Sequence, residues 1–126
     1  MLRAIRGAAT VGSNTADDIK KATKQMLLEI MTANNLSPGQ IISAIFTLTP
    51  DLNAAFPAAA ARELGWNGVP MMCAQEVAVP GALPMVVRVL IHADLPHEAR
   101  HVYQGGAVAL RPDWVAQMQK GETQTT

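Results

Sequence analysis

The sequence has little charge, few aromatic side chains and a single cysteine. Only 16% of its 126 residues are charged, and ten lysines and arginines balance ten aspartates and glutamates. A chain with no net charge is a poor candidate for non-specific nucleic-acid binding, which requires a clustered basic surface. The lone Cys73 excludes an intramolecular disulfide and argues against a zinc site built from cysteines.

The sequence also has no long hydrophobic run. No stretch approaches the ~18 apolar residues of a membrane-spanning helix, and the start, from Met1 to Arg6, lacks the apolar centre of a signal peptide. What the chain does have is a high apolar content, 49% of its residues. That content is enough for one compact core, so we expect a soluble, cytoplasmic domain with neither membrane nor nucleic acid as a partner.

Strand-like and helix-like patterns alternate along the chain. Helices are predicted from an N-cap at Thr15 to Asn34–Asn35, and over Ala58–Leu64 after Pro57. Strands are predicted at 2–11, 41–49, 69–79 and 85–92, with a short fifth strand at 101–103.

The order β-α-β-α-β-β indicates an α/β (or α+β) mixed sheet with helices packed on one face. A strand, a long helix and another strand form a crossover unit, so the first two strands are expected to run parallel. We expect one domain over residues 1–115 and a polar, disordered tail over residues 116–126.

Charged residues interrupt three of the apolar strands. Arg88 is the centre of Met85–Ile91, Arg6 lies inside the first strand, and Glu76 lies in the third. A guanidinium in an apolar strand has a large desolvation cost unless it is paired or lines a wet cleft. Glu76 and Arg88 are on strands joined by a short connection. A structural ion pair and a ligand-binding cleft both account for them.

Converging arginines favour an anionic ligand, because guanidinium groups pair bidentately with carboxylates and phosphates. The sequence has no glycine-rich phosphate-binding loop, so a carboxylate-bearing metabolite is the better hypothesis. The spacing of His97 and His101 is weak evidence for a metal, and Cys73 between apolar residues is more typical of a core thiol than of a nucleophile. We expect neither a metal nor a cofactor.

Six segments occur in a recognisable order along the chain. They are Ala4–Val11, Thr49–Leu52 with Ala55–Ala58 and Ala61–Arg62, Val69–Glu76, Leu83–Pro84 with Arg88–Leu90, Arg100–Tyr103 and Leu110–Asp113. Together they resemble the AroH-class chorismate mutases. The resemblance implies a homotrimeric pseudo-α/β-barrel whose active sites lie in clefts between subunits. It also implies the rearrangement of chorismate to prephenate, on the route to phenylalanine and tyrosine, without a cofactor.

The resemblance further implies roles for particular residues. Arg88 matches the arginine that hydrogen-bonds the ether oxygen of the substrate, and Glu76 matches the carboxylate that accepts a hydrogen bond from the ring hydroxyl. The other matches are substrate-binding positions: Arg6, Tyr103, Cys73, Arg62, Phe56, Leu110 and Arg111. Two alternatives stay open, namely a related trimeric imine or enamine deaminase and a non-catalytic regulatory trimer that binds a carboxylate-bearing metabolite.

Overall fold

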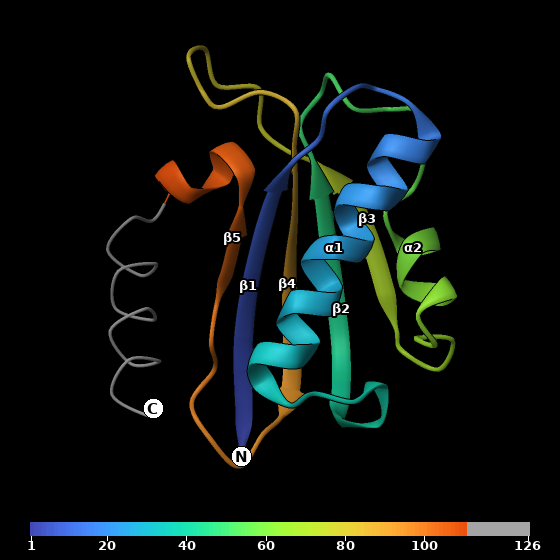
Figure 1. Ribbon diagram of the computed structural model, residues 1–126, viewed down its shortest axis with the longest axis vertical. Helices are drawn as coiled ribbons and strands as arrows, with labels where there is room; N and C mark the ends of the chain where they lie inside the picture. The colour runs from blue at the N-terminus through green and yellow to red at the C-terminus, as the bar shows by residue number, and fades with distance from the viewer. Residues whose placement is uncertain (111–126) are drawn as a thin grey trace.

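A five-stranded sheet with helices on one face forms the fold, in a computed structural model that describes residues 1–110 (Figure 1). The elements in chain order are β1 (Leu2–Thr10), α1 (Ala16–Asn34), the 3-10 helix η1 (Pro38–Gln40), β2 (Ile41–Leu48), α2 (Ala58–Glu63), β3 (Met71–Gln75), β4 (Val86–Asp94), β5 (Val102–Gln104) and the 3-10 helix η2 (Gly105–Leu110). The predicted domain boundary after residue 115, the tail at 116–126 and Arg111 lie outside the described residues.

The strand order is β3-β2-β4-β1-β5, so β4 lies between the first two strands of the sequence. β4 pairs antiparallel with both β1 and β2, which therefore run parallel to each other without being neighbours. β3 and β5 pair in parallel with β2 and β1 at the two edges. The predicted mixed sheet with helices on one face is confirmed, and the fifth strand is present next to β1.

Local sequence explains where α1 begins and ends. The Thr15 hydroxyl accepts a hydrogen bond from the backbone N–H of Asp18 at 3.2 Å. The carboxylates of Asp17 and Asp18 both lie in the first turn, near the positive end of the helix dipole. At the other end, Asn35 adopts a left-handed conformation with φ 46°, which closes the helix.

The third strand is shorter than the sequence predicted. Residues 69–79 were expected to form it, but the strand covers only Met71–Gln75. Pro70 has no N–H to contribute to a ladder, and a tight turn with a 2.9 Å hydrogen bond from the Val79 N–H to the Val77 carbonyl follows Glu76. The β-branched residues after Glu76 are therefore in a loop.

The main core lies between the sheet and its two α-helices. Alternate residues of each strand face the helices, and the largest buried side chains include Phe46, Ile91, Met26 and Trp66. No helix among residues 1–110 combines the length and the apolar composition needed to cross a membrane.

The other face of the sheet is called the open face here. It is the face opposite α1 and α2, and it carries Arg6, Thr47, Arg88 and Tyr103. The 3-10 helix η2 covers one end of it, where Ala8, Val86, Tyr103 and Ala107 form a second, smaller buried cluster. The charged residues that interrupt the strands are therefore directed away from the main core.

Candidate active site

One row of the open face crosses four strands. Arg88 on β4 lies opposite Thr47 on β2 and opposite Ala8 on β1, and Ala8 in turn lies opposite Tyr103 on β5. Residues in register on neighbouring strands point to the same side of a sheet, so these side chains share one surface. Arg88 and Tyr103 are two strand spacings apart, about 10 Å, with the small Ala8 between them.

Glu76 meets Arg88 at one end of this row. The Glu76 N–H donates to the Leu48 carbonyl at 2.9 Å, which extends the pairing of β3 with β2 by one residue. Its Oε2 atom then lies 3.0 Å from Arg88 Nε, with the Arg88 and Glu76 side chains 29% and 17% exposed. The expected closeness of Glu76 and Arg88 is present, and the pair is half-buried and open to a small ligand.

The Arg88–Glu76 contact leaves a donor unused. Arg88 Nε is buried and makes no hydrogen bond within the described residues, because the short contact to Glu76 has poor hydrogen-bond alignment. Buried N–H groups are nearly always hydrogen-bonded in native proteins, so one without a partner requires an explanation. A ligand oxygen arriving on the open face would provide the missing acceptor.

Arg6, Tyr103 and Leu110 are arranged around the same surface. Arg6 is two residues before Ala8 on β1 and lies opposite Leu90, one row away from Arg88. Its backbone N–H donates to His101 Nδ1 at 2.9 Å, which ties β1 to the segment before β5. Leu110, at the end of η2, packs beside the cluster that contains Tyr103.

Cys73, Phe56 and Arg62 lie elsewhere in this chain. Cys73 is three residues from Glu76 and pairs with Phe46, so it contacts the helix-covered core instead of the open face. Phe56 precedes α2 and is 70% exposed, and Arg62 is exposed in the last turn of α2. The residues expected to line the cleft therefore form two separate groups within one chain.

The structure adds Thr47, a residue to which the sequence did not point. Its hydroxyl donates a 2.8 Å hydrogen bond to Glu76 Oε2, the same oxygen that Arg88 approaches. Threonine is common in strands, so its presence in the apolar run of β2 gave no warning of a site. In retrospect, the signal is a hydroxyl at the penultimate position of β2, because the parallel neighbour β3 is followed directly by Glu76.

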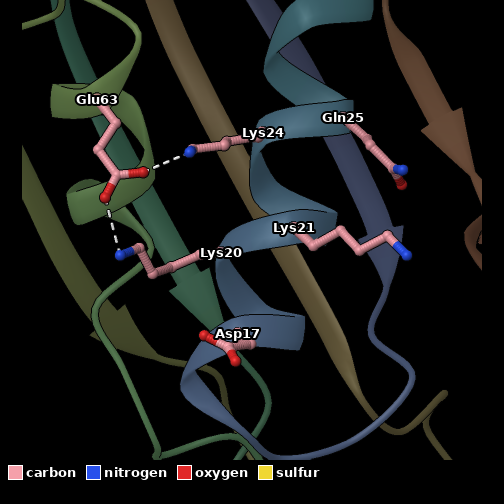
Figure 2. A pocket seen from close by; sticks show the side chains of 6 residues that line it. All are labelled: Asp17, Lys20, Lys21, Lys24, Gln25 and Glu63. Carbon is pink, nitrogen blue, oxygen red and sulfur yellow. Dashed lines mark ion pairs between the residues drawn. The ribbon is translucent and has the colours of Figure 1, made fainter.

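A separate hollow of about 420 Å³ lies between α1 and α2, on the helix-covered side (Figure 2). Its lining residues are Asp17, Lys20, Lys21, Lys24, Gln25 and Glu63. Glu63 pairs with Lys20 at 2.8 Å and also with Lys24. Hydrogen bonds and charge from these two lysines lower the pKa of Glu63 to about 2. Two of the three lysines therefore already have an anionic partner, and the hollow is a weaker ligand site than the open face.

Comparison with known proteins identifies the family. The family model for chorismate mutase type I matches residues 2–114. Chorismate mutase AroH of Thermus thermophilus is 49% identical over 117 residues, covering 90% of this chain and 96% of that protein. AroH of Bacillus subtilis (strain 168) is 44% identical over 117 residues, with 90% and 92% covered. A solved chorismate mutase from Clostridium thermocellum superposes with a TM-score of 0.82 and 47% identity over 84% of this chain and 97% of that one. This chain therefore belongs to the type I chorismate mutases, and it is an isomerase.

Proposed function

We propose that the open face forms one wall of the active site in which this chain rearranges chorismate to prephenate. The observation that carries the proposal is the half-buried Arg88–Glu76 pair with its unused Arg88 Nε–H, in a chain of this family. Chorismate carries two carboxylates and a ring hydroxyl. Its recognition therefore calls for cationic donors beside one acceptor, and this surface offers both.

The chemistry needs no nucleophile and no proton transfer. One C–O bond breaks and one C–C bond forms within the same molecule, and negative charge develops on the ether oxygen as the C–O bond lengthens. Arg88 donates to that oxygen and stabilises the transition state more than the ground state. A preorganised donor of this kind contributes about 3–4 kcal/mol, against the ~8 kcal/mol that a modest enzymatic acceleration requires.

The other open-face residues hold the substrate in a reactive shape. Glu76 accepts a hydrogen bond from the ring hydroxyl, and Arg6 and Tyr103 bind the carboxylates, with Leu110 beside them. Fixing the compact conformer in which the two carbon ends approach each other lowers the entropic part of the barrier. The Arg88 and Tyr103 positions are about 10 Å apart, with the buried Ala8 between them.

A neighbouring subunit completes the cleft. Phe56 and Arg62 are exposed beside and within α2, away from Arg88, so they reach the same ligand only if a second copy supplies them, whereas the Cys73 side chain contacts the core of its own chain. The open face also carries Ile45, 38% exposed, and Met72, 68% exposed, which are apolar side chains suited to burial between copies. The active sites of this proposal lie at the subunit interfaces of a homotrimer.

Substitution of Arg88 tests the proposal. Chorismate is added to purified protein and its loss is followed by ultraviolet absorbance. Arg88→Ala is expected to lower kcat by about two orders of magnitude or more. Arg88→Lys recovers little, because an ammonium does not reproduce the planar fork of donors. The matched control is Arg3→Lys, the same exchange on the helix-covered side of β1.

The alternative role for Arg88 is purely structural and predicts a different result. If the pair with Glu76 only holds the fold, both variants lose thermal stability together with activity. Thermal unfolding is therefore measured on the same preparations. A folded Arg88→Ala protein with near-normal kcat would remove Arg88 from the mechanism.

A further inference from the structure

We propose that Thr47 is a positioning residue of this enzyme, which acts by fixing the carboxylate of Glu76. The inference rests on the proposed function of the open face. It starts from one oxygen atom, because Glu76 Oε2 accepts a 2.8 Å hydrogen bond from Thr47 Oγ1 and lies 3.0 Å from Arg88 Nε.

The backbone places these three side chains together. Thr47 and Arg88 are directly opposite each other on antiparallel strands, so their Cβ atoms are about 5 Å apart. Glu76 follows the last residue of β3, whose partner on β2 is Leu48. The Glu76 N–H donates to the Leu48 carbonyl at 2.9 Å, which brings its side chain to the Thr47 side of the sheet. The geometry follows from strand register and does not depend on a flexible loop.

The hydroxyl matters because the carboxylate has two competing uses. Glu76 has to accept a hydrogen bond from the substrate hydroxyl, yet it lies beside a cation that attracts it. A carboxylate held only by Arg88 would swing towards a bidentate pair, which is the preferred geometry of guanidinium and carboxylate. That movement would occupy the donors that Arg88 needs for the ether oxygen. The Thr47 hydroxyl fixes Oε2 by its hydrogen bond and keeps the pair at the poorly aligned contact that leaves Arg88 Nε unused.

The first variant removes only the hydroxyl. Thr47→Val keeps the shape and the β-branching of the side chain, so the strand and the fold are retained. We expect kcat to fall about tenfold with a smaller change in KM, because the lost alignment weakens the transition state more than the bound substrate. Thr47→Ser restores the hydroxyl and is expected to return kcat to near the wild-type value. The matched control is Ser43→Ala, which deletes a hydroxyl on the same face of β2, four residues away.

A double-mutant cycle separates positioning from packing. In a Glu76→Gln background, Thr47→Val is expected to cause no further loss, because the group that Thr47 positions is already altered. An equal tenfold loss in both backgrounds would overturn the inference, since the hydroxyl would then act through the fold. Wild-type kcat in Thr47→Val would overturn it as well. Failure of the proposed function has a different signature, because wild-type protein would then leave chorismate unchanged.

Discussion

Gly7 is a core position at which the fold has little room for added volume. It lies in β1 facing α1, and a Cβ built there would be 2.6 Å from Ile30 Cδ1 and 3.1 Å from Val89 Cγ1. Gly7→Ala is therefore expected to reduce the free energy of unfolding by about 1–3 kcal/mol, the usual cost of overpacking a core. Urea denaturation measures the change. Gly39→Ala is the control, because no atom lies within 4 Å of its Cβ position and the substitution should be neutral or mildly stabilising.

Glu63 gives the protein a specific dependence on acid. The two lysines lower its pKa to about 2 from the model-compound value of 4.5, so the pairing stabilises the folded state above pH 4.5 and is lost as the pH falls towards 2. The Tm difference between wild type and Glu63→Gln should therefore be largest near neutral pH and vanish at about pH 2. Because the groups are exposed, added salt should shrink the difference. Glu98→Gln is the control, and an equal pH dependence in both variants would contradict this role of Glu63.

At the scale of elements, hydrogen bonds join the end of α1 to the segment that precedes the edge strand β5. The buried Asn34 amide donates to the Ile30 carbonyl and to the Arg100 carbonyl, each at 2.9 Å, and accepts from the Arg100 N–H at 2.8 Å. Asn34→Ala removes the amide partner of both the Arg100 N–H and the Arg100 carbonyl, and should cost about 2–4 kcal/mol of unfolding free energy in a urea titration. Asn35→Gly is the matched control, since glycine accepts the left-handed conformation of that position. A loss below about 0.5 kcal/mol would mean that water replaces the amide.

Local chemistry made the elements predictable but not their order in the sheet. The Thr15 cap, the Asn34–Asn35 stop and the β-branched run of β2 each determine a boundary within a residue or two. The local sequence does not show that β4 lies between β1 and β2. A strand with an antiparallel neighbour and a strand with a parallel neighbour both contain buried, β-branched residues.

Site residues could be predicted from the sequence where a charged side chain stands in an apolar stretch. Arg88 is a charge inside an apolar strand and Glu76 is a charge directly after one, and they do meet. Thr47 fits a strand well, so only the register shows its contact with Glu76. Cys73 lies three residues before Glu76, and the alternation of β3 directs it to the helix-covered core, as expected of a core thiol. Phe56 and Arg62 lie apart from the Arg88–Glu76 pair within one chain.

At the scale of the whole molecule, the proposed cleft between subunits predicts that two inactive variants rescue each other. We consider a trimer assembled from equal amounts of Arg88→Ala and Arg62→Ala chains. A site has both arginines where the open face of an Arg62→Ala chain meets the α2 surface of an Arg88→Ala chain. For random cyclic mixing, about a quarter of the sites should be intact, and activity should recover to about that fraction of wild type. Co-refolding the two variants and assaying chorismate loss measures this.

The control for this rescue mixes Arg88→Ala with Glu76→Gln. Arg88 and Glu76 both belong to the open face of the same chain. Every chain in the mixture lacks one of the two, so no site contains both and no recovery is expected. Light scattering on the same samples reports the mass of the assembly. An active monomer would overturn the shared cleft, and so would rescue in the control mixture.

The place of β1 between β4 and β5 limits the order in which the chain can fold during synthesis. Leu2 is paired with Asp94 and Thr10 with Val86, and the other neighbour of β1 is β5. The first strand to leave the ribosome thus has no strand to pair with until nearly all the described residues have followed. Closing such a long loop is slow, so the segment from α1 to β4 is expected to assemble first and to receive β1 afterwards. Until then, the apolar residues of β1 are available to chaperones and to other nascent chains.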